Sequence, residues 1–555
     1  MSRLSARPRR LVSTQYYLNL AIVRPHLFRI ERELLLKRLE SVKASYDLDG
    51  GCMEGTRQSI LNDVMDWVAN TQEGNETLQK NSYWFYGSPG IGKTSLAHSI
   101  CEKLHYQKHL AGAFFCRRDD PDLNNPRNIL PTFITKLAGI FPAFRRIVAE
   151  RLRNDPNLTP QSMKPFIFLD FIRNLPRRPE RTLVFVIDAL DECGDDRSRP
   201  SLLRVLTDAA AQAQWLRIII TSRPEADIQR FFDTPDTRTS HMRYDLAADD
   251  EASSDLRVFA QDRFGWVAFK QHLKSPWPEQ SLFDGVISRA AGLFIFVKTI
   301  SLVLEHCEDP TAVLKDTLQG PSGTGLTSLY GLYSSILRAR IVHSDDKFRR
   351  MVGVLLATAP YSLLHDETIA TLAGVEARLV ERWVDDLSSL LYRDEGANGG
   401  IRVRHLSISD FFINEYCDYK VDLQDAHAQL GITCLETMVK RLRFNICKLE
   451  DSRVANADIE DLQSRIKVNI SGALQYSSLH WSNHLCVTPQ ITIRDRRILA
   501  SLNGFFEGLY PLLWIEVLSI MGVVPIAAPS LRRVISWVKV SACNESSSHQ
   551  VSHLL

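Results

Sequence analysis

One run of residues has the types and spacing of a phosphate-binding loop. Residues 87–94 are GSPGIGKT, which fits the pattern G-x-x-x-x-G-K-[ST]. In this pattern the glycines let backbone N–H groups wrap phosphate oxygens, the lysine reaches the outer phosphates, and the final hydroxyl offers a ligand to Mg²⁺. We therefore predict that this loop binds a nucleoside triphosphate, ATP or GTP, together with Mg²⁺. The residues expected to form the binding site are Gly87, Ser88, Pro89, Gly90, Ile91, Gly92, Lys93, Thr94 and Ser95, with Thr94 as a metal ligand.

A second group of candidate residues is acidic and follows an apolar run. Residues 182–193 are TLVFVIDALDEC, a buried-strand pattern that ends at Asp188 and continues into two further acids. Acids at the carboxyl end of a strand would lie beside the phosphate loop. Asp188 is then placed to hold Mg²⁺, and Asp191 or Glu192 could polarise the water that attacks the γ-phosphate.

A third candidate is an arginine at the end of another apolar run. Residues 215–225 are WLRIIITSRPE, in which polar residues, Arg223 among them, follow the apolar stretch. We predict that Arg223 stabilises the γ-phosphate, the alternative being an ion pair with a surface acid.

These candidates lie on elements that predict an α/β fold with a parallel sheet. A helical stripe covers residues 57–69, and apolar runs suited to strands occupy residues 83–86, 111–116, 183–187 and 216–221 with helical patterns between them. From about Asp249 onward helical patterns dominate. The exception is a mixed region at 348–412, which ends in the strand-like segment IRVRHLSI (401–408).

Composition limits the classes of protein that fit. The 555 residues include 67 basic and 65 acidic side chains, a balance that argues against binding nucleic acid through bulk positive charge. No apolar run reaches the length of a membrane helix, and the ten scattered cysteines fit a reducing compartment. We expect a cytoplasmic protein. The six arginines before Glu31 leave mitochondrial import as a minor alternative to a solvated basic arm.

Taken together, the motifs resemble those of one family. The segments CMEGTR, WFYGSPGIGKTSLAHSI, AGAFFCRRDD, FVIDALDEC, IIITSRPE, AAGLFIFVKTISLVLE and VRHLSISDFF, spread from Cys52 to beyond Trp481, are similar to NACHT-domain proteins of the STAND class of P-loop NTPases. The likeness is greatest to the fungal, NLR-like group. A departure is Ala189, where many members have glycine.

The resemblance implies a role for each matching residue. Gly92, Lys93 and Thr94 would bind phosphate and magnesium, Asp188 would be the magnesium acid, Glu192 and Asp191 would serve hydrolysis, and Arg223 would be the sensor arginine. His405 would touch the β-phosphate in a closed state, although Leu406 follows it where plant and animal relatives have aspartate. Residues 55–57 would contact the base.

The same resemblance implies seven segments. We expect a basic arm and helix at 1–50, a helical lead-in and linker at 51–80, a NACHT core at 81–248, a small helical domain at 249–340, a winged-helix-like domain at 341–415, a C-terminal helical domain at 416–540 and a polar tail at 541–555. The repeat array that commonly follows in fungal members is expected to be absent, either because this chain pairs with full-length relatives or because its gene model is truncated.

The expected function is a nucleotide-dependent switch that hydrolyses its nucleotide slowly and assembles into homo-oligomers when activated. Fungal relatives suggest nonself recognition or cell-death regulation. Two alternatives stay open: a metabolic P-loop kinase, and a scaffold that binds nucleotide without turnover. We do not expect a zinc site at His480, His484 and Cys486, because no further ligand pair is near in the sequence.

Overall fold

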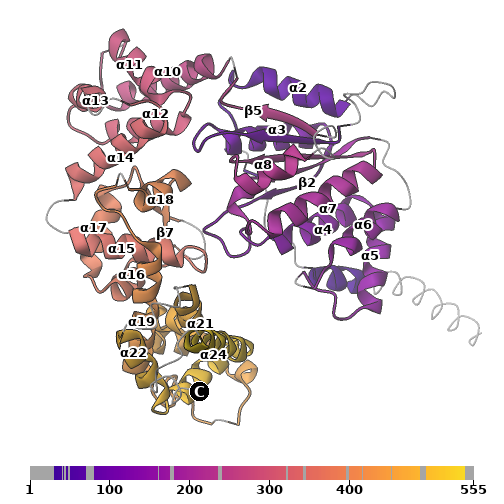
Figure 1. The fold of residues 1–555 in the computed structure, drawn as a ribbon, viewed down its shortest axis with the longest axis vertical. Coiled ribbons are helices and arrows are strands. Elements are labelled where there is room, and N and C mark those ends of the chain that lie inside the picture. Colours follow the sequence, from indigo (N-terminus) through magenta and orange to yellow (C-terminus); the bar gives the residue numbers. More distant parts are fainter. Residues whose placement is uncertain are drawn as a thin grey trace, which may run out of the picture. The chain divides into compact units, whose positions relative to one another are not determined.

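The computed structural model describes residues 30–543 except for 40–41, 43–45, 48–49, 70–79, 161, 176–180, 235–240, 250, 275, 320–322, 342–344, 395–398, 416, 452 and 488–495. The expected arginine-rich arm, most of the expected linker and most of the polar tail therefore lie outside the described residues. The chain forms two compact units, Met1–Phe259 and Ala260–Leu555 (Figure 1).

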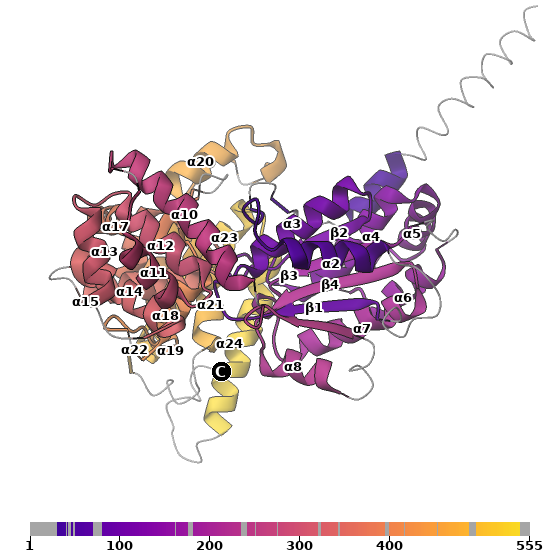
Figure 2. The same ribbon diagram turned by 90° about the horizontal axis from the view of Figure 1, so that it is seen from above.

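The first unit is built on a five-stranded parallel sheet (Figure 2). Its strands lie in the order β2-β3-β4-β1-β5. Their bounds are β1 Ser82–Tyr86, β2 Leu110–Phe115, β3 Leu183–Asp188, β4 Leu216–Ser222 and β5 His241–Asp245. The four predicted strands are confirmed. Strand β5 was not predicted, because its sequence HMRYD has no apolar run.

Helices cover both faces of this sheet. Their bounds are α2 Gln58–Ala69, α3 Lys93–Tyr106, α4 Ile129–Ile140, α5 Pro142–Asn154, α6 Pro165–Arg173, α7 Ser198–Gln212 and α8 Ala226–Asp233. On one face Phe133 of α4 stacks on Phe185 of β3 at 3.9 Å between ring centroids. On the other, His98 of α3 stacks on Phe115 of β2 at 4.2 Å. Since successive residues of a strand point to opposite faces, these contacts define a three-layer α/β/α core.

The second unit is mainly helical, as predicted. Its helices are α11 Gln280–Ala290, α12 Phe294–Leu304, α13 Pro310–Gln319, α14 Leu326–Arg340, α15 Asp345–Thr358, α16 Asp366–Ala373, α17 Ala377–Asp386, α18 Leu406–Ile413, α19 Leu423–Arg441, α20 Leu462–Asn469, α21 Gly472–Val487, α22 Arg496–Phe506, α23 Tyr510–Ile520 and α24 Ala527–Cys543. Helix α10, Ala252–Lys270, begins in the first unit and ends in the second.

One predicted strand in the second unit is wrong over most of its length. Strand β7 covers only Ile401–Val403, paired antiparallel with β6 (Leu391–Arg393), and α18 begins at Leu406. The chain turns from strand to helix because His405 caps α18: its Nδ1 accepts the backbone N–H of Ser407 at 3.1 Å. The apolar periodicity of IRVRHLSI did not reveal this cap.

Membrane-spanning potential is limited in the part of the chain that the structure describes. No single helix there is long and apolar enough to cross a membrane. Helices α22 and α23 meet the length and composition requirements only as a pair bent by 74°.

The C-terminal helices contain a cluster of histidines, of which His484 is buried and His427 and His480 are half-buried. His427 of α19 and His484 of α21 are joined through their Nδ1 atoms at 2.8 Å, and the Tyr476 hydroxyl lies 2.8 Å from Nε2 of His484. Both ring nitrogens of His484 are thus hydrogen-bonded. Burial lowers the pKa of His427, lowers that of His480 to about 4, and lowers that of His484 well below its usual value.

This cluster predicts that acid destabilises the α19–α21 pair. A histidine that is neutral in the folded protein takes up a proton on unfolding below about pH 6.5. Each such histidine therefore lowers the free energy of unfolding by up to about 1.4 kcal/mol for each pH unit below that value. The free energy of unfolding should have its full value above pH 6.5 and should decrease as the pH falls toward 4. Hydrogen exchange of α19 and α21 peptides, corrected for intrinsic rates, should show weaker protection at pH 5 than at pH 7.5.

The substitution His480→Phe keeps an aromatic ring but removes one of the titrating groups. It should reduce the loss of protection at pH 5, whereas His306→Gln, at an exposed histidine, should not. Equal protection of α21 at both pH values in the wild type would contradict this interpretation.

Candidate functional site

The phosphate-loop motif lies between β1 and α3, as the sequence predicts. Two of its glycines, Gly90 at φ 80° and Gly92 at φ 98°, have left-handed backbone conformations that other residues rarely adopt. Gly92 is the N-cap of α3, which begins at Lys93. The positive end of the helix dipole and the free N–H groups of the first turn therefore face the loop, an arrangement that favours anions.

Lys93 is held across the beginning of the loop. Its Nζ donates to the carbonyl oxygens of Gly87 at 2.8 Å and Ser88 at 2.9 Å. Burial lowers the pKa of Lys93 to about 8, while the negative charge of Asp191 opposes that shift most strongly. The ammonium therefore remains mainly charged at pH 7, and it is held by neutral carbonyls that an anionic phosphate could replace.

Asp188 and Thr94 supply the oxygen atoms expected of a magnesium site. Asp188 ends β3, is only 2% exposed, and accepts a hydrogen bond from the Thr221 hydroxyl. The Thr94 hydroxyl also donates to it, and burial raises the pKa of Asp188 to about 6. A carboxylate beside a hydroxyl is the hard-oxygen chemistry that Mg²⁺ prefers, so these residues fit the ion.

Asp191 is bound to Arg223. Its Oδ1 accepts the backbone N–H of Arg223 at 2.9 Å, and its Oδ2 lies 3.3 Å from the Arg223 Nε. Asp191 is 5% exposed. The two predicted site residues are therefore brought together, and both carboxylate oxygens of Asp191 are engaged in positioning Arg223.

Glu192 is the acid left to interact with water. It is half-buried, and its Oε2 accepts the backbone N–H of Arg118 at 3.2 Å. Burial, followed by the nearby charge of Asp191, raises the pKa of Glu192 to about 7. A carboxylate with this pKa can accept a proton near neutral pH, which suits a group that orients or activates water.

Ala189 has a backbone conformation that favours glycine. Its φ of 52° is left-handed, and its N–H donates to the Thr221 hydroxyl at 3.0 Å. This turn directs the chain from β3 into the short 3₁₀ helix Leu190–Glu192. Alanine is the smallest residue with a Cβ and occupies the strained turn here, so the turn is kept despite the departure from glycine.

His405 lies in the second unit, where it caps α18 and contacts the Ser407 hydroxyl at 2.7 Å. Its contact with a β-phosphate stays a prediction. Arg57 donates from Nη2 to the carbonyl of Ile91 inside the phosphate loop at 3.1 Å, and the contact of residues 55–57 with a base stays a prediction. No local sequence pattern predicts the contact between Arg57 and Ile91.

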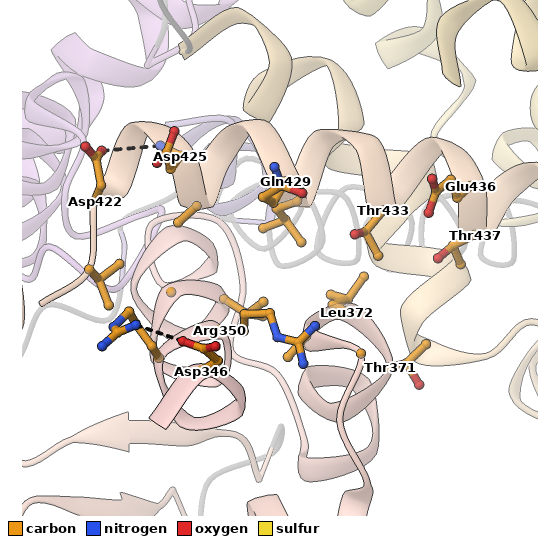
Figure 3. Close-up of a pocket in the computed structure, with 18 of the residues that line it drawn as sticks. Asp346, Arg350, Thr371, Leu372, Asp422, Asp425, Gln429, Thr433, Glu436 and Thr437 are labelled. Atoms are coloured by element: carbon orange, nitrogen blue, oxygen red, sulfur yellow. Dashed lines mark hydrogen bonds and ion pairs between the residues drawn. The ribbon is translucent and has the colours of Figure 1, made fainter. Parts of the chain in front are cut away.

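A separate cavity of about 1060 Å³ lies in the second unit between α15, α16 and α19. Figure 3 shows Arg350 and Leu372 across this cavity from Gln429 and Thr433. Acidic and basic residues occur in equal numbers along its walls. The charges along its walls balance, and the proposed function does not use this cavity.

Comparison with known proteins gives one family match. Residues 55–223 match the family model described as Nephrocystin 3, N-terminal, which is less than a third of the chain. No curated protein matches this sequence.

Three solved structures show some likeness to this chain. The Walker-type ATPase PABY2304 of Pyrococcus abyssi is 13% identical, with 64% of this chain and 95% of that chain covered, at a TM-score of 0.32. The STAND protein PH0952 of Pyrococcus horikoshii, which has a tetratricopeptide repeat sensor, is 13% identical, with 86% and 65% covered, at 0.36. The Aeropyrum pernix ORC1 protein, solved with DNA, is 10% identical, with 68% and 96% covered, at 0.32. These likenesses are low, so the assignment of the core depends on its strand order, its phosphate loop and the acids at the end of β3. On those grounds the first unit contains a P-loop NTPase core, and residues 55–223 within it are similar to the N-terminal region of nephrocystin 3.

Proposed function

We propose that this chain is a nucleotide-dependent molecular switch of the NACHT type, which binds ATP or GTP with Mg²⁺ and hydrolyses it slowly. The observation that carries the proposal is the convergence of Lys93, Asp188 and Glu192 at the carboxyl edge of one sheet. The charges of Asp188 and Glu192 both act on the pKa of Lys93. A lysine, a metal-binding acid and a water-orienting acid are the groups that phosphoryl transfer to water requires.

Each residue has a distinct part in the proposed reaction. The loop amides and Lys93 bind and orient the phosphates, and Thr94 and Asp188 would hold Mg²⁺, which neutralises charge on the phosphate oxygens. Glu192 accepts a hydrogen bond from water and directs it at the γ-phosphorus. Arg223 donates to the γ-phosphate oxygens from the position that Asp191 gives it.

The ion pair between Asp191 and Arg223 supports a switch in particular. A γ-phosphate would compete with the Asp191 carboxylate for the same guanidinium, so the nucleotide state changes a contact inside the core. A ligand shifts a conformational equilibrium by its difference in affinity for the two states, and this exchange provides such a difference.

The cellular role is proposed from the motif resemblance. We propose a cytoplasmic protein that acts in fungal signalling, nonself recognition or cell-death regulation. It would assemble with copies of itself or with related full-length NACHT proteins when the triphosphate is bound.

Turnover assays distinguish this function from the two alternatives. Purified protein should release phosphate from Mg·ATP or Mg·GTP slowly, with the same rate whether or not phosphoryl acceptors such as nucleoside monophosphates are present. Stimulation by an acceptor would establish the kinase alternative, and binding without any turnover would establish the scaffold.

A further inference from the structure

Arg57 carries a charge that is almost completely removed from solvent. Its side chain is 3% exposed, and its backbone is in the left-handed region at φ 55°. A guanidinium stays protonated in proteins, so burying it is costly unless ion pairs and hydrogen bonds compensate. The partners of Arg57 therefore show what holds it in this place.

One partner is the phosphate loop. The Nη2 of Arg57 donates to the carbonyl of Ile91, which lies between the two left-handed glycines Gly90 and Gly92. In a trans peptide the C=O and the next N–H point in opposite directions. Holding the Ile91 carbonyl toward Arg57 therefore turns the N–H of Gly92 away from it, and so fixes the direction of one loop amide.

The other partners are two carboxylates. Asp249 precedes α10, and Asp255 lies in its first turn. Arg57 forms an ion pair with Asp249 through Nη1, and its Nε lies 3.9 Å from Oδ2 of Asp255. The Asp255 carboxylate also accepts the backbone N–H of Arg57 at 3.0 Å. Asp249 further accepts a hydrogen bond from the Tyr244 hydroxyl of β5 at 3.3 Å.

This buried cluster contains two carboxylates and one guanidinium. The side chains of Asp249 and Asp255 are 4% and 7% exposed, and burial raises the pKa of Asp255. Removing one partner of a buried charge cluster leaves the other charges uncompensated, which is strongly destabilising. The members of such a cluster are therefore expected to move together. Movement of the Ile91 carbonyl would therefore change how α10 is held.

We propose that Arg57 is a positioning residue that couples the phosphate loop to α10, the helix that leads from the first unit into the second. The proposal rests on the nucleotide-binding function proposed above. When nucleotide fixes the loop amides, Arg57 transmits that constraint through Asp249 and Asp255 to the first turn of α10. By thermodynamic reciprocity, the same contacts make the position of α10 affect nucleotide affinity.

Hydrogen exchange of peptides covering 87–96 and 252–260, with and without Mg²⁺ and adenosine or guanosine β,γ-imidotriphosphate, tests the proposal. In the wild type the nucleotide should slow exchange in both peptides. In Arg57→Gln, affinity should fall by about fivefold or more, a typical size for coupled sites, and the nucleotide should no longer protect 252–260.

Two further variants make the test specific. Asp255→Asn leaves Arg57 bound to Ile91 and Asp249 but weakens its link to α10, so it should lose part of the protection in 252–260 and, by the same reciprocity, part of the affinity, each less than in Arg57→Gln. The matched control is Arg217→Gln, which removes another buried guanidinium of the same core. The Arg217 Cζ lies 4.7 Å from the centre of the Trp67 ring, and this variant should keep both the wild-type affinity and the protection of 252–260.

The outcomes separate this proposal from the proposed function. Full nucleotide protection of 252–260 in folded Arg57→Gln and Asp255→Asn, with affinity unchanged, would overturn the coupling while nucleotide binding stands. Absence of nucleotide binding to the wild type would overturn both.

Discussion

Replacing Lys93 with alanine is expected to abolish nucleotide binding. The Lys93 ammonium is the side-chain charge held over the loop, bonded to the carbonyls of Gly87 and Ser88, and the loop amides alone offer only partial charges. Titration calorimetry with Mg·ATP and Mg·GTP should give no measurable heat for Lys93→Ala under conditions in which the wild type saturates.

A matched control for this variant exists on the same helix. Lys103 lies in the last turn of α3, away from the loop, so Lys103→Ala should bind as the wild type does. Circular dichroism must show that Lys93→Ala is folded. Unchanged affinity in folded Lys93→Ala would remove the phosphate loop from the account.

Replacing Glu192 with glutamine is expected to separate binding from hydrolysis. The amide keeps the shape of the side chain and leaves Asp188 and Thr94 in place, but it is a far weaker base than the carboxylate. Nucleotide affinity should remain, whereas hydrolysis should fall by roughly 10²-fold or more. Glu225→Gln, at an exposed glutamate that precedes α8, is the control and should hydrolyse normally.

The pH dependence gives a second test of the same residue. Burial raises the pKa of Glu192 to about 7, and the ionised form is the one that can accept a proton from water. Wild-type hydrolysis should therefore increase as pH rises through about 7 toward pH 8, above which Lys93 begins to lose its proton, while the residual rate of Glu192→Gln should lack the step near pH 7. If Glu192→Gln turns over at the wild-type rate, the role passes to another acid or the scaffold alternative gains support.

The sequence predicted the sheet and the loop because both are encoded locally. Runs such as LVFVI at 183–187 are apolar, short and bounded by turn residues, and the spacing of glycines and Lys93 specifies the loop. Strand β5 was not predicted because its residues are mostly polar, and only its pairing with β1 identifies it as a strand. The helix cap at His405 was not predicted, because a histidine before an apolar run is also compatible with a strand.

The contacts that tune the site depend on residues far apart in the chain. Arg57 is hydrogen-bonded to carboxylates nearly 200 positions away in the sequence, and no local sequence pattern predicts such a contact. The pairing of Asp191 with Arg223 likewise joins the ends of two strands, so from the sequence Asp191 and Glu192 were equal candidates for the water-orienting acid. The pKa of Glu192 also reflects burial, which only the folded chain reveals.

Light scattering of the purified full chain with Mg·ADP and with a non-hydrolysable triphosphate tests the central claim, a switch controlled by nucleotide, most directly. The account predicts a monomer with the diphosphate and a larger assembly with the triphosphate, and it predicts that Lys93→Ala stays monomeric in both. A wild-type protein that binds the triphosphate and has the same mass in both nucleotide states would contradict it.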